Sequence, residues 1–149
     1  MEWLDLTGLW IMAIILLPNL LFAMKRQPAF SPELPNKILA LFEQIGRYGC
    51  MIFLVLNIPC TQTGFWFPYA SIVYPLGNAA LLTAYFVCWV VFWNKITATG
   101  AFLLSALPTA IFLFSGVVRG SIPLLLSAVI FGVCHISISV GSRKNPIES

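Results

Sequence analysis

Residues 101–118 read AFLLSALPTAIFLFSGVV and indicate the class of fold. The run contains no Asp, Glu, Lys or Arg, and its apolar residues do not alternate with polar ones as in a barrel strand. About 20 mostly apolar residues cross the hydrocarbon core of a bilayer as a helix, which satisfies its own backbone hydrogen bonds there. The stretch therefore predicts a membrane-spanning helix.

Four further apolar runs accompany this one, so we expect an all-α integral membrane bundle of five transmembrane helices. Pro, Gly and polar residues separate the runs and mark the connections between helices. The spans are expected at residues 8–24, 38–58, 69–93, 101–118 and 124–140. They leave no room for a separate soluble domain, which predicts a single transmembrane domain over residues 1–149.

The composition excludes several classes of protein. Hydrophobic residues make up 60% of the chain and charged residues 9%, whereas a soluble domain carries about 25% charged residues. A soluble globular domain and a disordered chain are therefore excluded. The net charge of +3 is too small and too scattered to predict nucleic-acid binding. The four cysteines and the single histidine show no zinc-ligand spacing, so we expect neither a metal site nor a cofactor.

Basic residues between the expected spans predict the orientation, because cytoplasmic loops carry an excess of Lys and Arg. Arg119 falls on one side of a five-span arrangement, and Arg47 lies within a span. The other basic residues all fall on the opposite side: Lys25, Arg26, Lys37, Lys95, Arg143 and Lys144. We therefore expect the N-terminus outside and the C-terminus in the cytoplasm, in a cell membrane of bacterial type.

Glu43 and Arg47 are the first candidate site residues, because charges inside a spanning helix tend to face the bundle interior or water. They are four residues apart, so their side chains share one helix face and can pair. Two readings remain open. The pair either belongs to a functional polar site or only neutralises itself while joining two helices.

A depth count brings three more polar side chains to the level of Glu43. Asn19, Ser105 and His135 lie roughly 6–8 Å from the cytoplasmic ends of their expected spans, at the helical rise of about 1.5 Å per residue. With Arg47 one turn deeper, these residues predict a polar layer drawn from four spans. His135 is its titratable member and could relay a proton near neutral pH, although ordinary helix packing is an open alternative for this residue.

Asn57, Tyr74 and Asn78 are secondary candidates. The two asparagines are expected to form hydrogen bonds between helices, each contributing about 1 kcal/mol or less. The alternative for Tyr74 and Asn78 is that they line an outer vestibule together with Pro75.

Four short motifs resemble a group of uncharacterised small polytopic membrane proteins of low-GC Gram-positive bacteria. The motifs are LPN at 17–19, FEQIGR at 42–47, FSG at 114–116 and GVCHI at 132–136. The resemblance implies no activity. It implies only that Asn19, Glu43, Arg47 and His135 occur together in similar proteins.

These observations predict a membrane protein that binds or transports a small solute, an ion or a lipid through an inner-leaflet polar site, alone or as a subunit. One alternative is an intramembrane enzyme that uses Glu43 or His135 for acid–base chemistry on a lipid. The other is a structural or assembly subunit without a ligand. The expected partners are the lipid bilayer, the small solute or lipid ligand, and a membrane protein or a second copy of the chain. Nucleic acid is not expected.

Overall fold

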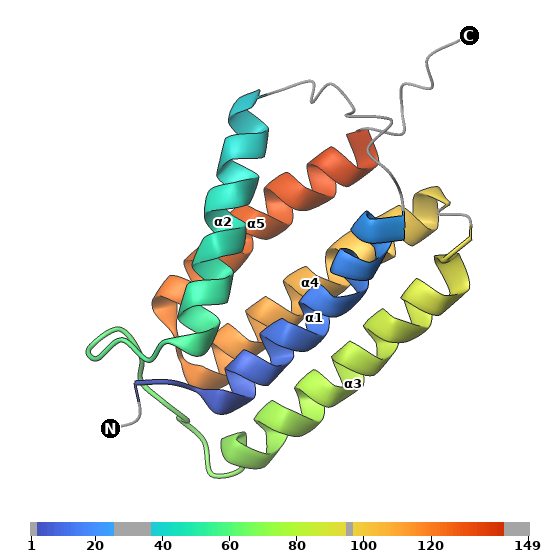
Figure 1. Ribbon diagram of the computed structural model, residues 1–149. Coiled ribbons are helices and arrows are strands. Elements are labelled where there is room, and N and C mark those ends of the chain that lie inside the picture. Colours follow the sequence, from blue (N-terminus) through green and yellow to red (C-terminus); the bar gives the residue numbers. More distant parts are fainter. Residues whose placement is uncertain (1–2, 26–36, 95–96, 142–149) are drawn as a thin grey trace, which may run out of the picture.

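The computed structural model describes residues 3–25, 37–94 and 97–141, and within these ranges the regular structure is entirely helical (Figure 1). Two isolated bridges, between Leu4 and Leu56 and between Gln62 and Ser121, add short contacts between extended segments. The helices are α1 (Leu6–Lys25), α2 (Lys37–Val55), α3 (Ala70–Phe92), α4 (Ala98–Arg119) and α5 (Ile122–Gly141). The prediction of an all-helical chain is thereby confirmed.

Four of the helices, α2 to α5, are long and apolar enough to cross a membrane. The apolar stretch of α1 among the described residues is shorter and covers Leu6–Leu21. This architecture is consistent with a membrane protein. A soluble bundle of this size could not bury long helices that are apolar on most faces, whereas a bilayer covers such faces with lipid.

Local capping explains why α1 and α4 begin a few residues before their apolar runs. α1 begins at Leu6 because the Asp5 carboxylate accepts hydrogen bonds from the N–H groups of Thr7 and Gly8, at 2.8 and 3.1 Å. α4 begins at Ala98 because the Thr97 side chain caps it. Polar capping residues lie outside the apolar run, so hydropathy alone places these ends too late.

α2 ends at Val55, three residues before the end of the expected span, because its last residues pair with the start of the chain. The Asp5 N–H donates to the Val55 carbonyl at 2.8 Å, and the Asn57 N–H donates to the Trp3 carbonyl at 2.9 Å. These backbone bonds replace the hydrogen bonds that a further helical turn would make. They attach the N-terminal segment to the end of α2.

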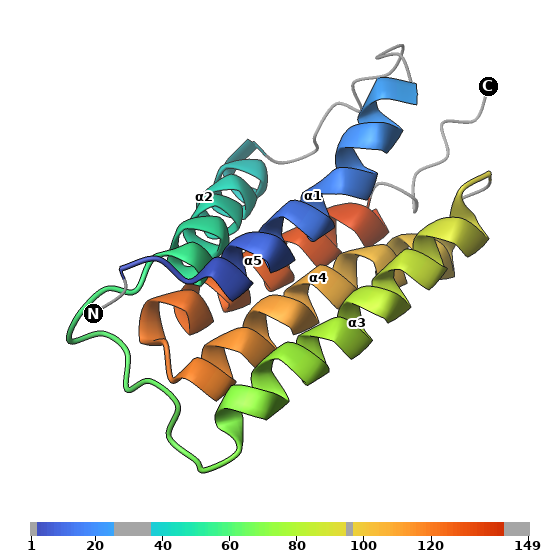
Figure 2. The ribbon, with the colours of Figure 1, turned by 60° about the horizontal axis from the view of Figure 1, so that its bottom comes forward.

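α2, α5, α4 and α3 pack side by side in that order, and α1 lies across one face of the layer, in contact with α2 and α3 (Figure 2). Gly46 explains how closely α2 approaches α5. A Cβ atom at this position would lie 2.5 Å from the Phe131 backbone nitrogen, so only glycine fits. The close approach leaves Glu43, which lies about one turn before Gly46 on the buried face of α2, beside α5.

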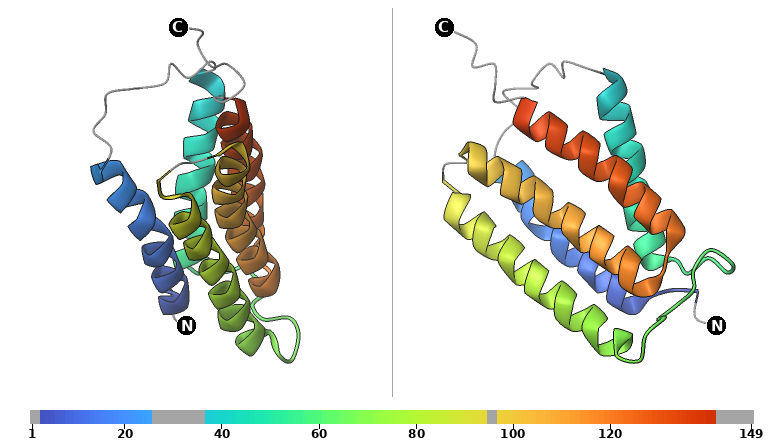
Figure 3. Two further views of the ribbon diagram at one scale, coloured as in Figure 1. Left: turned by 90° about the vertical axis from the view of Figure 1, so that its right-hand side faces the viewer. Right: turned by 180° about the vertical axis from the view of Figure 1, so that it is seen from behind.

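The segment between α2 and α3 runs along one end of the bundle, where the start of α1 and the turn between α4 and α5 also lie (Figure 3). Its Thr63 N–H donates to the Gly120 carbonyl at 3.2 Å, and the Ile122 N–H donates to the Thr61 carbonyl at 3.3 Å. Gly120 adopts a left-handed φ of 59° and ends α4. Segments distant in sequence therefore meet at this end.

Candidate functional site

Glu43, Arg47 and His135 form a polar cluster between α2 and α5, which we call the Glu43 cluster. The Oε1 atom of Glu43 forms an ion pair with Nη2 of Arg47, one turn further along α2. The same oxygen lies 3.0 Å from Nδ1 of His135 on α5. The expected pairing of Glu43 with Arg47 is present, and the expected approach of His135 to Glu43 is present as well.

The three side chains of the Glu43 cluster differ strongly in exposure. The side chain of Glu43 is 7% exposed, that of His135 26% and that of Arg47 43%. The His135 ring stacks on Phe131, with ring centroids 4.7 Å apart and planes inclined by 18°. The carboxylate is thus enclosed, whereas its two nitrogen partners form the accessible side of the cluster.

Ser105 lies beside the same helix as His135 but bonds to a different side chain. Its hydroxyl is 2.6 Å from the Ser139 hydroxyl on α5, one helical turn beyond His135, and 2.8 Å from the Ala101 carbonyl. Ser105 of α4 therefore contacts α5 on the same face of α5 that holds His135. Within the described residues its hydrogen bonds do not reach Glu43 or Arg47.

Asn19 departs from the expected polar layer. Its amide donates to the Ile15 carbonyl of its own helix at 3.2 Å, and the Tyr85 hydroxyl of α3 donates to the same carbonyl at 3.5 Å. α1 packs on α2 and α3. The expected depth of Asn19 equals that of Glu43, but depth alone does not fix the direction in which the Asn19 side chain points. The structure does not join Asn19 to the Glu43 cluster.

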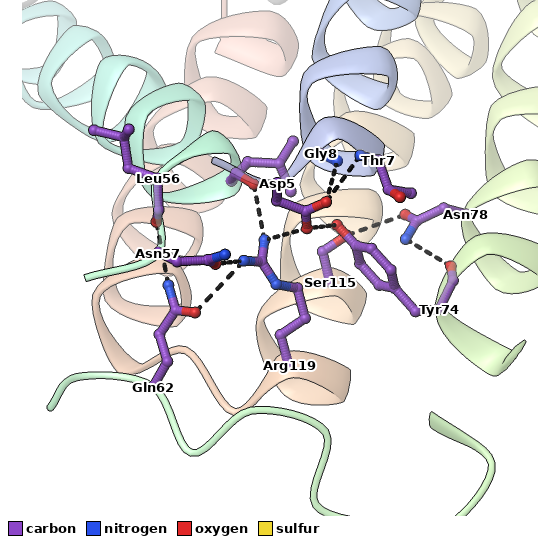
Figure 4. Close-up of polar contacts among 11 residues, drawn as sticks. Asp5, Thr7, Gly8, Leu56, Asn57, Gln62, Tyr74, Asn78, Ser115 and Arg119 are labelled. Carbon is purple, nitrogen blue, oxygen red and sulfur yellow. Dashed lines mark hydrogen bonds and ion pairs between the residues drawn. The ribbon is translucent and has the colours of Figure 1, made fainter. Parts of the chain in front are cut away.

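A second set of polar residues, the Arg119 cluster, lies at the opposite ends of these helices (Figure 4). Arg119 Nη1 lies 2.9 Å from Asp5 Oδ2 and donates to the Leu54 carbonyl at 2.8 Å. Its Nη2 donates to Asn57 and, at 3.5 Å, to Gln62. Although Arg119 ends its helix, its side chain is only 6% exposed.

Tyr74 and Asn78 extend the Arg119 cluster along α3. The Tyr74 hydroxyl donates to Asp5 at 3.3 Å, and the Arg119 guanidinium lies 5.7 Å from the centre of the Tyr74 ring. Asn78 donates to the Tyr74 carbonyl at 2.9 Å and accepts from the Ser115 hydroxyl of α4 at 3.1 Å. Asn57, Tyr74 and Asn78, the secondary candidates, are thus joined in one network, and Asn78 links α3 to α4 as expected.

A cavity of about 610 Å³ lies beside the Arg119 cluster. Asp5 and Arg119 contribute to its lining, as do Tyr74 and Pro75, two of the residues expected to line an outer vestibule, whereas the third, Asn78, is not among the described residues that line it. Asp5 and Arg119 neutralise each other, and the contacts of Arg119 join α2, α4 and the N-terminal segment. We interpret the Arg119 cluster as a structural clamp, by which we mean a set of contacts that holds these segments together.

Sequence reasoning missed the pairing of Asp5 with Arg119. The available signal was that Arg119 is the isolated basic residue on its side of the five-span arrangement and that Asp5 is expected on the same side. Depth counting from the expected cytoplasmic ends of the spans could not detect this pair, because both residues lie at the other end of their helices.

Among the residues that the structure describes, no group of three or more His, Cys, Asp or Glu side chains is placed to hold a metal ion. All four cysteines are free: Cys50, Cys60, Cys88 and Cys134. No protein-family model, no curated protein and no solved structure matches the chain.

Proposed function

We propose that this chain is a multi-pass protein of the cell membrane, with five spans and its N-terminus outside, that binds a small solute, an ion or a lipid at the Glu43 cluster. Ligand binding, alone or as a step of transport, is the proposed role. The single observation that carries the proposal is the enclosed Glu43 carboxylate with two nitrogen partners of increasing exposure, His135 and Arg47. The full length of α1, Leu6–Lys25, supports a fifth span.

The chemistry of the cluster favours a ligand with an anionic oxygen group. Arg47 uses one nitrogen of its planar guanidinium on Glu43, and a guanidinium offers five N–H donors in all. Arg side chains bind carboxylates and phosphates through paired N–H groups. A phosphate group, free in the cytoplasm or on a lipid, matches this donor set.

The test is the stability of the purified full chain in neutral detergent during titration with inorganic phosphate at constant ionic strength. Binding at about 100 times the Kd raises the free energy of unfolding by about 2.7 kcal/mol. Arg47→Gln should abolish this rise. Ser137→Ala is the matched control, because its hydroxyl is exposed on α5 and, among the described residues, bonds the Val133 carbonyl of its own helix alone.

A second arm separates the two sources of phosphate. Micelles doped with phosphatidylglycerol, compared with phosphatidylcholine, should stabilise the chain if the ligand is an anionic lipid headgroup. No response of the wild-type chain to either probe, or an unchanged response in Arg47→Gln, would refute the proposal.

Two further variants distinguish the proposal from its alternatives. If Glu43→Gln and Arg47→Gln both lower stability and the wild-type chain shows no phosphate response, the cluster only joins α2 to α5. If an added phospholipid is turned over by the wild-type chain and not by His135→Gln, the protein is an enzyme.

A further inference from the structure

The outward face of α2 carries polar side chains in the middle of an apolar surface. The buried face of this helix consists of Glu43, Gly46, Cys50 and Leu54. On the opposite side, Gln44 and Tyr48 are exposed and lie one helical turn apart. The apolar residues around them are also exposed: Leu41, Ile45 and Ile52.

The exposed polar side chains midway along the other helices have partners in their own backbone. Asn19 bonds the Ile15 carbonyl on α1, Thr83 bonds the Ala79 carbonyl on α3 at 2.8 Å, and Ser137 bonds the Val133 carbonyl on α5 at 2.6 Å. Within the described residues, neither Gln44 nor Tyr48 has a comparable side-chain hydrogen bond. Both expose a polar group to whatever surrounds α2.

Depth makes this exposure unfavourable in a bilayer. Gln44 lies seven residues after the start of α2, which corresponds to about 10 Å at a rise of about 1.5 Å per residue. Tyr48 lies a further turn inward. Hydrocarbon supplies no hydrogen-bond partner at such depths, so a polar group there favours association with another helix.

We propose that this face of α2 packs against α2 of a second copy of the chain. The two copies would be related by a two-fold axis along the membrane normal, which brings Gln44 against its counterpart at the same depth. A primary amide is both donor and acceptor, so two glutamines complement each other without any other group. Tyr48 adds a hydroxyl one turn away, and the surrounding apolar residues form the packing surface.

This proposal does not depend on ligand binding at the Glu43 cluster, because Glu43 faces α5 and Gln44 faces outward. Arg47 lies beside the outward face and is not at its centre, so the two-fold axis does not require the guanidinium groups to meet. The interface can therefore be tested while the Glu43 cluster stays intact.

The experiment measures the monomer–dimer equilibrium of the full chain in liposomes by single-molecule photobleaching at several protein-to-lipid ratios. The wild-type chain should become dimeric as the ratio rises. Gln44→Leu should weaken dimerisation roughly tenfold, as expected for loss of interhelical hydrogen bonds, and Gln44→Asn should restore part of it. Thr83→Val is the matched control on an exposed face of α3 and should dimerise like the wild type.

Thermal unfolding checks that Gln44→Leu remains folded, as its exposure predicts. A wild-type chain that stays monomeric at every ratio would overturn the proposal. Dimerisation that is equally strong in Gln44→Leu would also overturn it, as would a two-component complex with another membrane protein in place of the dimer.

Discussion

Replacing Arg119 with Met should destabilise the bundle more than any other single change to a charged residue discussed above. Met preserves much of the volume of the side chain and removes the guanidinium. The Asp5 carboxylate and the Leu54 carbonyl then lose a donor at 2.9 and 2.8 Å, and the Asn57 amide oxygen loses its bond to Nη2. The free energy of unfolding should fall because these acceptors lie at a buried junction of three segments.

The magnitude follows from burial. Removing one partner of a buried ion pair costs about 3–5 kcal/mol. Asp5 is 16% exposed and keeps its bonds from Thr7, Gly8 and Tyr74, which places the loss near the lower end. We therefore expect a loss of about 3 kcal/mol. Arg119→Lys should recover only part of it, because an ammonium group cannot reach Asp5, Leu54 and Asn57 with a planar fork.

The assay is reversible unfolding of the purified chain in mixed micelles by titration with sodium dodecyl sulfate, followed by circular dichroism. A double-mutant cycle with Asp5→Asn separates the ion pair from the other bonds. The double variant should lose less stability than the sum of the single variants. A loss below about 0.5 kcal/mol in Arg119→Met, the range of ordinary surface substitutions, would refute the interpretation of the Arg119 cluster as a clamp, as would strict additivity in the cycle.

Three further outcomes are expected. Gly46→Ala should lower the free energy of unfolding by about 1–3 kcal/mol in the same assay, because the new Cβ would overlap the Phe131 backbone; an unchanged value would mean that α2 and α5 separate easily. Thr97→Ala should cost about 1 kcal/mol, because Thr97 accepts the Gly100 N–H at the start of α4; Thr97→Ser should restore it. Cys60 is exposed and should react with an impermeant maleimide in intact cells; labelling only after permeabilisation would reverse the proposed orientation.

Parts of the Glu43 cluster could be predicted from the sequence because they depend on local geometry. Glu43 and Arg47 pair because residues four apart on a helix are neighbours, whatever surrounds the helix. The contact between Glu43 and His135 was anticipated only through their common depth. Asn19 has the same expected depth and still bonds elsewhere, since residue counting measures height along the membrane normal and gives no rotation about the helix axis.

The sequence by itself determined the helical, apolar character of the chain and the approximate limits of its helices, because hydropathy and backbone hydrogen bonding act over short stretches. Only the tertiary structure decided which polar groups meet. The pairing of Asp5 with Arg119 and the approach of His135 to Glu43 depend on how α1, α4 and α5 are placed in the bundle. Such contacts join distant segments, and the close packing that selects them, as at Gly46, exists only once the helices have assembled.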